Sequence, residues 1–270
     1  MEEIFKSIIF GIVQGITEWL PISSTGHLLL LDKFLTLQLS DNFKELFMVV
    51  IQLGSILAVV VLYFKTLNPF SFKKTKTENK ASLVIWLKVV VATIPALILG
   101  LLLDDLIDEV LSTSQVIAAM LFFYGVIYVL LEKWNKSRKL KIDKIEKITY
   151  LDAFKMGCFQ TLALIPGTSR SGSTILGGLI IGIDRTTAAQ FSFFMAIPVM
   201  VGASFLKLIK LGYSYDSLEL WVLFVGTLVS FLVSMFVIKK LINYVRRHDF
   251  SIFGWYRIII SIIVTLVFVF

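Results

Sequence analysis

The sequence predicts an all-α integral membrane protein, a polytopic helical bundle built as an inverted-topology repeat. Three observations support this fold class. The chain is 57% hydrophobic with a mean hydropathy of +0.86, whereas soluble domains are about 45–50% apolar. Several apolar segments are long enough to cross a bilayer, and two others are broken midway by turn residues. No polar stretch is long enough for a soluble module, so we expect a single membrane domain over residues 1–270.

Six segments reach or approach the roughly 20 apolar residues that a transmembrane helix needs. They are residues 46–64, 83–103, 116–131, 187–205, 220–238 and 253–270. We therefore expect about six full spans.

The other two apolar regions each consist of a pair of shorter runs. Residues 4–20 and 28–35 flank Pro21 and a Ser-Ser-Thr-Gly turn, and residues 151–165 and 175–183 flank Pro166-Gly167. Non-helical backbone at membrane depth is tolerated only inside protein or beside water. Each region is therefore predicted to be a re-entrant helical hairpin that enters and leaves the membrane on the same side.

The two broken regions also resemble each other in sequence. The matches are GIVQ (11–14) with GCFQ (157–160) and Gly26 with Gly172 at an offset of 146, and PISS (21–24) with PGTS (166–169) at 145. Chance similarity of two Ser/Gly-rich turns is the alternative. Three spans follow each region, which predicts repeat halves 1–147 and 148–270. Because three is odd, the halves must be inverted, and such repeats place their site near the midplane.

The distribution of charge predicts the orientation. Three segments are rich in Lys and Arg, at residues 65–80, 133–147 and 239–247, and alternating spans put all three on one side. By the positive-inside rule this side is cytoplasmic. The segment 104–109, an acidic loop in this reading, has no Lys or Arg and falls on the other side. The first hairpin then enters from outside and the second from inside.

Charge and cysteine content exclude several other classes. The net charge of +7 is explained by cytoplasmic loops, and without interleaved RNA-type motifs no nucleic-acid partner is expected. The single cysteine, Cys158, excludes an internal disulfide and a thiolate metal site. The first 15 residues are acidic before their apolar run and lack a small-residue cleavage signal, so we expect retained structure and not a signal peptide.

The first broken region places ionisable groups in hydrocarbon, which by default marks a functional site. Gln14 and Glu18 are four residues apart and share a helix face. Ser24 and His27 share the first turn of the second half-helix if it begins near Ser23, where free N–H groups favour an anion. Ser24 can supply a nucleophile and His27 can carry a proton. The alternatives are a polar cluster at the headgroups for Glu18, and a helix cap with a simple hydrogen bond for the Ser–His pair.

The second broken region contributes Arg170. A buried arginine needs a carboxylate, a phosphate or a water-filled cavity, and its planar fork suits phosphate. The surrounding PGTSRSG (166–172) is small and hydroxyl-rich, so backbone N–H groups can approach an anion closely. The alternative is a structural Arg170–Glu18 salt bridge between the hairpins, which is compatible with a phosphate site at rest.

Together these residues provide a nucleophile, a proton carrier, a fixed cation and a carboxylate. Phosphoryl transfer requires this set, because its catalysis is mostly positioning and charge stabilisation. Glu18 is also a candidate metal ligand, since Mg²⁺ sites often use one or two carboxylates plus phosphate oxygens.

At these residues the chain resembles the undecaprenyl-diphosphatase family of bacterial membranes, also called the bacitracin-resistance protein family. The motifs that carry the resemblance are QGITE (14–18), PISSTGH (21–27), IQLGSIL (51–57) and PGTSRSG (166–172). The likeness in length and hydropathy extends over the whole chain. The family has Glu or Gln at the first position of the first motif, so with Gln14 a metal site is expected to depend on Glu18 alone.

The resemblance implies removal of the terminal phosphate of undecaprenyl diphosphate, which recycles the lipid carrier for peptidoglycan synthesis and gives bacitracin resistance. It also implies a multi-pass protein of the bacterial cytoplasmic membrane, a site toward the extracytoplasmic side, and a divalent metal, Mg²⁺ or Ca²⁺. The catalytic residues carried over are Glu18, Ser24, His27 and Arg170. The substrate-binding residues carried over are Gln14, Thr25, Gly26, Thr168, Ser169, Ser171 and Gly172.

Several alternatives stay open at this point. Either Glu18 or His27 could take the proton of Ser24, and water could attack directly instead. The second functional hypothesis is a transporter or flippase of polyprenyl phosphates, because inverted repeats with re-entrant hairpins are transport architecture. A phosphatase of soluble substrates is a third, against which the apolar residues 28–31 and 191–194 favour a lipid tail. Small residues at 202–204 are of the kind that packs helices or a homodimer.

Overall fold

The computed structural model describes residues 1–138, 140–211 and 215–269, and every regular element within them is a helix. Six helices in this described part of the chain are long and apolar enough to cross a membrane. They are α3 (Asp41–Leu62), α5 (Lys76–Leu111), α6 (Ser114–Asn135), α9 (Arg185–Leu211), α10 (Ser217–Val245) and α11 (Ser251–Phe268). The predicted polytopic helical membrane protein is confirmed. Lys139 of a predicted basic segment and Phe270 of the last predicted span lie outside the described residues.

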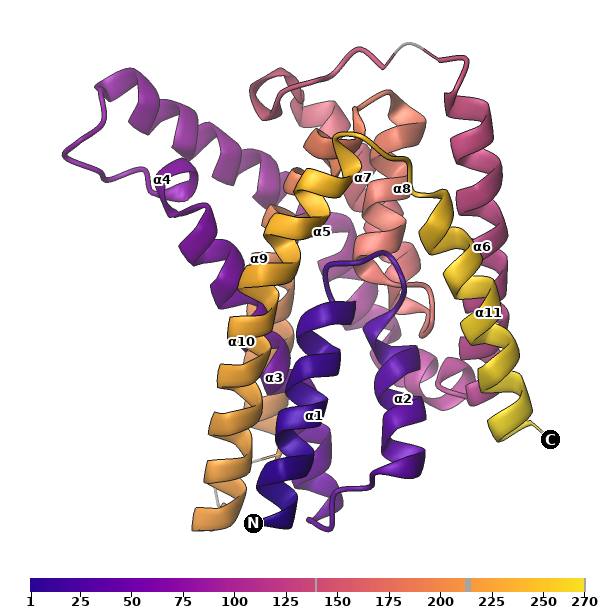
Figure 1. Cartoon of the computed structure of the whole chain (residues 1–270). Coiled ribbons are helices and arrows are strands. Elements are labelled where there is room, and N and C mark those ends of the chain that lie inside the picture. Colours follow the sequence, from indigo (N-terminus) through magenta and orange to yellow (C-terminus); the bar gives the residue numbers. More distant parts are fainter. Residues whose placement is uncertain (139, 212–214, 270) are drawn as a thin grey trace.

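Two pairs of shorter helices form the predicted hairpins. The first pair is α1 (Glu2–Thr17) and α2 (Ser24–Phe34), and the second is α7 (Tyr150–Thr161) and α8 (Arg170–Ile181). In Figure 1, α1 rises to a turn in the middle of the molecule and α2 returns downward, whereas α7 descends to its turn and α8 returns upward. The hairpins therefore open toward opposite ends of the bundle. The division of the halves at residues 147 and 148 stays a prediction.

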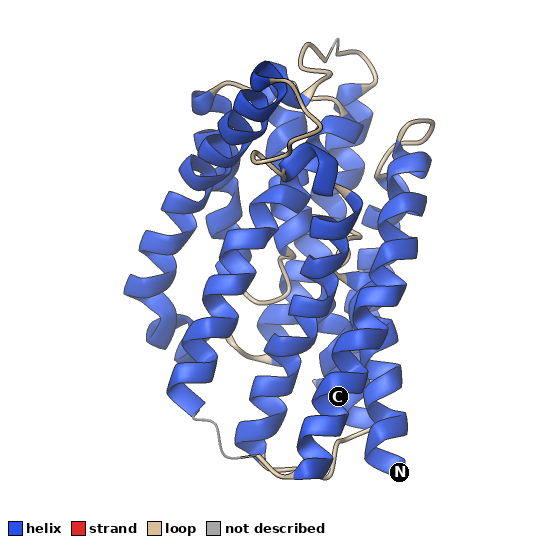
Figure 2. Cartoon of the chain, turned by 90° about the vertical axis from the view of Figure 1, so that its left-hand side faces the viewer, coloured by secondary structure: helices blue, strands red, loops and turns tan. Residues whose placement is uncertain are grey.

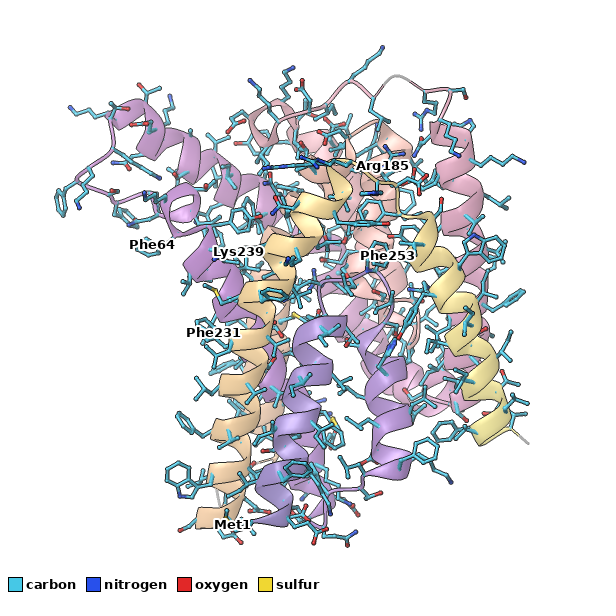
Figure 3. All side chains as sticks on the ribbon, in the orientation of Figure 1. Met1, Phe64, Arg185, Phe231, Lys239 and Phe253 are labelled. Carbon is cyan, nitrogen blue, oxygen red and sulfur yellow. The ribbon has the colours of Figure 1, made fainter. Side chains whose placement is uncertain are left out.

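The loops between the spans gather at two ends (Figure 2). The connections α3–α5, α6–α7 and α10–α11, which carry the basic segments, lie at one end, and the N-terminus lies at the other (Figure 1). Figure 3 agrees, since Arg185 and Lys239 lie toward the basic end and Met1 at the opposite tip. The alternation of spans expected from charge is thus the one that the fold has.

Two boundaries differ from the sequence expectation. The predicted acidic loop at 104–109 is instead a helical continuation of α5 to Leu111, although the apolar part of that helix ends at Leu103. The reason is that no Gly or Pro occurs between residues 104 and 111, so no residue of the segment ends the helix before Leu111. The run 151–165 ends as a helix at Thr161 and continues as the 3₁₀ turn η2 (Leu162–Leu164), ahead of Pro166. The remaining short elements are α4 (Phe64–Leu67) and η1 (Ile145–Lys147).

Each hairpin packs against a span of the other half. Helix α1 lies along α10, and α7 lies along α5. Gly11 faces the carbonyl of Gly226 on α10, and Gly157 faces the carbonyl of Ala92 on α5. Glycine at these positions lets the backbones approach closely, which is how helices associate in membranes. These contacts lock the two halves together and hold both hairpin turns in the interior.

Candidate active site

The two hairpin turns have the same local structure. Ser23 (φ 71°, ψ 97°) and Ser169 (φ 74°, ψ 121°) are the non-glycine residues with positive φ in the described chain. Each is an N-cap, with Oγ accepting from the backbone N–H of Gly26 at 3.4 Å or Gly172 at 3.0 Å. Such strained residues cost about 1–3 kcal/mol each and cluster at functional sites.

The residue after each strained serine is the first residue of a helix. Ser24 begins α2 and Arg170 begins α8. At an offset of 146, the predicted nucleophile and the predicted phosphate-binding cation therefore occupy the same position of the two repeats, each at a helix start. The offset of 145 expected from PISS and PGTS, which pairs Ser24 with Ser169, is wrong at the serines, because the two N-caps are Ser23 and Ser169. Because the hairpins enter from opposite ends, their turns meet, and these two side chains reach a common partner.

That common partner is Glu18, which accepts hydrogen bonds from three side chains. Oε1 lies 2.8 Å from Nη2 of Arg170. Oε2 accepts from Nε2 of Gln14 at 3.0 Å and from Oγ of Ser24 at 3.0 Å. The Glu18 side chain is 4% exposed and that of Arg170 is 10% exposed, so the pair is held in protein and not at the headgroups. The structure thus joins four predicted site residues in one hydrogen-bonded cluster.

Arg170 is held from several directions. Nη1 donates to the carbonyl of Ser192 at 3.1 Å, and Nη2 lies 3.7 Å from the sulfur of Met200. The guanidinium also lies 5.5 Å from the ring of Trp19, as a cation–π contact. Its Nε is buried and has no partner. The fork is therefore fixed in direction and keeps one donor for another ligand.

The hydrogen bonds of His27 go to residues other than Ser24. Its Nδ1 lies 2.7 Å from the carbonyl oxygen of Ser23, and its Nε2 lies 2.8 Å from the hydroxyl of Tyr256 on α11. Since Ser24 donates to Glu18, the structure brings the serine to the carboxylate and not to the imidazole. Of the two candidate bases, Glu18 is the one in contact with Ser24.

Comparison with known proteins places the chain among its relatives. Residues 7–263 match the family model described as bacitracin resistance protein BacA. The chain belongs to this family. It is 51% identical to the undecaprenyl-diphosphatase of Desulfitobacterium hafniense, with 98% of this chain and 96% of that protein covered. It is 52% identical to that of Enterococcus faecalis (98% and 97% covered) and 52% identical to undecaprenyl-diphosphatase 1 of Clostridioides difficile (97% and 95% covered).

The other predicted binding residues divide into two groups in this member of the BacA family. Ser171 donates to the backbone carbonyls of Glu18 and Leu20, both at 3.1 Å, so its hydroxyl ties one hairpin to the other. The amides of Gly26 and Gly172 are occupied by the serine caps. By contrast, Thr25 is exposed beside Ser24, and the hydroxyl of Thr168 is buried without a partner. These two residues are the ones with hydroxyl groups available to a ligand.

Arg257 is a site residue that the sequence reasoning missed. It is fully buried, and its guanidinium donates to carbonyls of both turns: Pro21 at 3.2 Å, Gly167 at 2.9 Å and Thr168 at 3.0 Å. A fourth bond, to Met120 at 3.3 Å, ties in α6. A signal was present, because Arg257 is an isolated arginine inside a predicted span, and intramembrane ionisable residues are functional by default.

Buried polar atoms without partners concentrate at this cluster. Over the residues that the structure describes, they include Oε1 of Gln14, Nε1 of Trp19, Oγ1 of Thr168, Nε of Arg170 and Nε of Arg257. Buried polar groups are hydrogen-bonded in more than about 90% of cases. The local excess is the arrangement expected of a site that takes a polar ligand.

Few side chains in the Glu18 cluster could coordinate a metal ion. No group of three or more His, Cys, Asp or Glu residues gathers within the described part of the chain. The donors that fit a divalent cation are the Glu18 carboxylate and the unpartnered Oε1 of Gln14 beside it. Mg²⁺ is often bound by one or two carboxylates together with substrate phosphates. The donor set therefore fits a metal ion that shares its coordination with a phosphate-bearing substrate.

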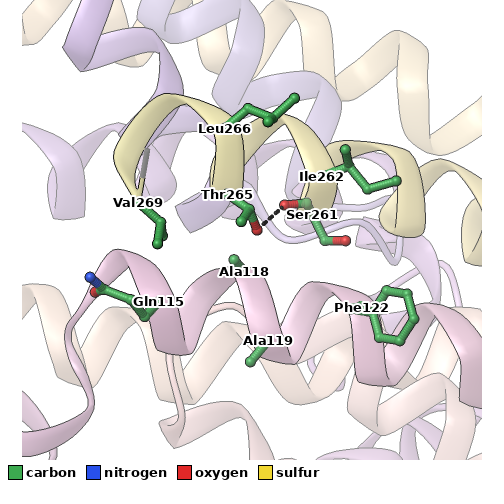
Figure 4. A pocket seen from close by; sticks show the side chains of 9 residues that line it. All are labelled: Gln115, Ala118, Ala119, Phe122, Ser261, Ile262, Thr265, Leu266 and Val269. Carbon is green, nitrogen blue, oxygen red and sulfur yellow. Dashed lines mark hydrogen bonds between the residues drawn. The ribbon is translucent and has the colours of Figure 1, made fainter.

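Two cavities lie apart from this cluster. One, of about 460 Å³, lies between α6 and α11 (Figure 4) and is lined by Gln115, Ala118, Ala119, Phe122, Ser261, Ile262, Thr265, Leu266 and Val269. The hydroxyls of Ser261 and Thr265 are bonded to backbone carbonyls of α11, which leaves its walls mostly apolar. The other, of about 340 Å³, includes Lys144 and Arg246 of the basic end. None of the predicted site residues lines either one.

Proposed function

We propose that this chain is an undecaprenyl-diphosphate phosphatase, which cleaves the terminal phosphate from undecaprenyl diphosphate to leave undecaprenyl phosphate and inorganic phosphate. The observation that carries the proposal is the contact of Glu18 with both Ser24 and Arg170, in a chain whose relatives of nearly equal length bear the name undecaprenyl-diphosphatase. Recycling of the lipid carrier and bacitracin resistance follow from this activity.

Substrate binding begins with Arg170. At rest its charge is balanced by Glu18, and the diphosphate takes over part of that pairing. The free Nε and one Nη nitrogen can then hold two phosphate oxygens in the bidentate geometry that arginine favours. The first residues of α2 and α8, Ser24 and Arg170, both bond Glu18, and helix starts favour anions. Arg257 adds a second buried cation that holds both turns in place.

The chemical step then uses Ser24 and Glu18. As Glu18 shifts its interaction from Arg170, Oε2 accepts the proton of Ser24, whose Oγ is already 3.0 Å away. Oγ forms a bond to the terminal phosphorus, and the bond from phosphorus to the bridging oxygen breaks, releasing undecaprenyl phosphate. Water then attacks this phosphorus and the bond from phosphorus to Oγ breaks. Glu18 returns its proton to Oγ, accepts a proton from the attacking water, and releases that proton to solvent, which regenerates the carboxylate. Arg170 balances the phosphate charge throughout.

A divalent metal ion, Mg²⁺ or Ca²⁺, fits beside this cluster. Glu18 and Oε1 of Gln14 would hold it. When bound, it would neutralise charge on the phosphate oxygens of the substrate.

The membrane setting completes the proposal. The six spans make the chain a multi-pass membrane protein. We assign it to the bacterial cytoplasmic membrane with the basic end in the cytoplasm, following the positive-inside rule. The α1–α2 hairpin then opens outward, which favours a site reached from the extracytoplasmic side. A homodimer through the exposed Gly202 and Ala203 of α9 stays a prediction.

One assay tests the function directly. Purified protein in detergent is given undecaprenyl diphosphate, and inorganic phosphate is measured, with and without EDTA and with Mg²⁺ or Ca²⁺ restored. Phosphate release by the wild type that falls with EDTA and returns with metal supports both the activity and the metal. Release that is insensitive to EDTA removes the metal from the proposal. No release by folded protein would overturn the phosphatase.

The inverted hairpins favour transport of polyprenyl phosphates as a second candidate function. Proteoliposomes loaded with a labelled short-chain polyprenyl phosphate distinguish the two. A transporter moves the label across the bilayer without releasing phosphate, and it does so even when Ser24 is replaced by alanine. A phosphatase alone leaves the label in its original leaflet.

A further inference from the structure

The hydrogen bonds of His27 define its protonation pattern. Nδ1 lies 2.7 Å from the carbonyl oxygen of Ser23, and a carbonyl can only accept, so Nδ1 carries a hydrogen. In the neutral ring Nε2 then has the lone pair, and the hydroxyl of Tyr256, 2.8 Å away, donates to it. The two rings are parallel, with an interplanar angle of 1° and centroids 5.5 Å apart. Both ring nitrogens are therefore fixed by partners.

The bond from His27 acts on the peptide unit that precedes Ser24. In the second half, the carbonyl of the strained Ser169 accepts from the backbone N–H of Ser173 at 2.9 Å. In the first half, the carbonyl of the strained Ser23 accepts from the side chain of His27, the residue equivalent to Ser173 at the 146-residue offset. Because this carbonyl belongs to the Ser23–Ser24 peptide, the imidazole helps to orient the backbone that carries the nucleophile.

Tyr256 is well placed to fix that imidazole. It comes from α11, the last helix of the chain, and contacts a residue of α2 that is 229 positions earlier. Its neighbour Arg257 bonds the carbonyls of Pro21, Gly167 and Thr168, so α11 is anchored to both turns at this level. Tyr256 itself is 39% exposed, so it is not one of the residues that fill the buried core.

We propose that Tyr256 is a positioning residue of the phosphatase site: it holds the His27 ring in one tautomer and orientation, and through the Ser23 carbonyl it aligns Ser24 with Glu18. The proposal rests on the phosphatase activity proposed above. It assigns to α11 a part in the reaction that no motif in the two hairpins contains.

Tyr256→Phe removes the hydroxyl and keeps the ring. His27 then loses its partner at Nε2, and its ring is free to turn away from the Ser23 carbonyl. Loss of one neutral hydrogen bond of this kind should lower kcat by roughly 3- to 10-fold. KM should change by less than about twofold, because Tyr256 contacts none of Glu18, Ser24 and Arg170, and uniform substrate binding is unaffected.

The experiment measures phosphate release from undecaprenyl diphosphate by four proteins: wild type, Tyr256→Phe, His27→Ala and the double variant. If Tyr256 acts through His27, the double variant has the same kcat as His27→Ala. The matched control is Tyr244→Phe, because Tyr244 also stacks on a histidine, His248, with centroids 4.4 Å apart. That pair adjoins the basic α10–α11 connection, outside the cluster, so kcat should not change.

Three results would overturn the inference. One is an unchanged kcat for Tyr256→Phe. Another is a change confined to KM, which would make Tyr256 a substrate-binding residue. The third is an equal fold-loss from Tyr256→Phe in the presence and absence of His27. Absence of phosphate release by the wild type would instead count against the phosphatase itself, so the two failures are distinguishable.

Discussion

Ser23 and Ser169 lie 146 residues apart and adopt the same strained conformation, with φ of 71° and 74°. Each caps the helix that follows it through its own hydroxyl, and each presents the next residue to the middle of the bundle. The two turns are alike in backbone but differ in chemistry, because the residue after Ser23 is a serine and the residue after Ser169 is an arginine. One repeat thus supplies the proposed nucleophile and the other the proposed phosphate-binding cation.

The first prediction concerns Ser24. Ser24→Ala should lower phosphate release by about 1,000-fold or more, because the attacking oxygen is lost. The wild type, quenched in acid during turnover, should show a phosphoryl group on residue 24 by mass spectrometry. Ser7→Ala is the control, since Ser7 is a buried serine of the same hairpin whose hydroxyl donates to the carbonyl of Ile4. Near-normal turnover of Ser24→Ala would mean direct attack by water.

The spans and hairpins could be predicted because their signals are local. Runs of apolar residues define the spans, and Pro21 and Pro166-Gly167 interrupt two of them. The meeting of Glu18 and Arg170 could also be predicted, since the repeat and the charge bias together place the two turns at the same depth. The salt bridge considered as an alternative to the phosphate site is formed, and it is compatible with a resting state of that site.

The contribution of α11 could not be predicted in the same way. Tyr256 reaches His27 and Arg257 reaches Pro21 across 229 and 236 residues, and no periodicity or motif encodes such contacts. Ser24 and His27 share a helix turn, and sequence spacing alone suggested a Ser–His pair. In the structure His27 hydrogen-bonds Tyr256 instead, because a partner on a neighbouring helix competes with the local one.

The second prediction separates charge balance from catalysis at Glu18. Glu18→Gln leaves Arg170 buried without a carboxylate, and breaking such a pair costs about 3–5 kcal/mol. The melting temperature in detergent should fall, and phosphate release should fall by about 100-fold or more. Adding Arg170→Gln should restore part of the melting temperature and none of the activity. Glu2→Gln is the control, because the Glu2 side chain is 78% exposed and surface pairs contribute little.

Recovery of activity in the Glu18→Gln, Arg170→Gln double variant would contradict this prediction. It would mean that the pair is a structural link between the hairpins and that the chemistry lies elsewhere.

The third prediction concerns Arg257. Arg257→Lys keeps a positive charge but replaces a planar fork that bonds four carbonyls with a single ammonium group of three donors. At least one buried carbonyl loses its partner, which costs about 1–3 kcal/mol. Thermal unfolding in detergent should show a lower melting temperature than the wild type. Arg247→Lys, at an exposed position, serves as the control. If the two variants have the same melting temperature, Arg257 does not stabilise the hairpin turns.

The fourth prediction tests the packing of the hairpins on the opposite halves. A Cβ at Gly11 would lie 3.0 Å from Cβ of Val229 and closer still to the carbonyl of Gly226, so Gly11→Ala must push α1 away from α10. Overpacking of this kind costs about 1–3 kcal/mol. Because α1 carries Glu18 at its end, the shift should also lower phosphate release. Thermal unfolding and the phosphate assay on the same samples measure both effects.

Gly202 provides the matched control for this packing test. It lies in a span, α9, and a Cβ there would meet nothing within 4 Å. Gly202→Ala should therefore keep full activity and melt at the same temperature or slightly higher, since alanine has the better helix propensity. If Gly202→Ala is instead as damaging as Gly11→Ala, that face of α9 is covered by something other than lipid. Cross-linking of wild-type protein in membranes would then show whether a second copy of this chain covers it.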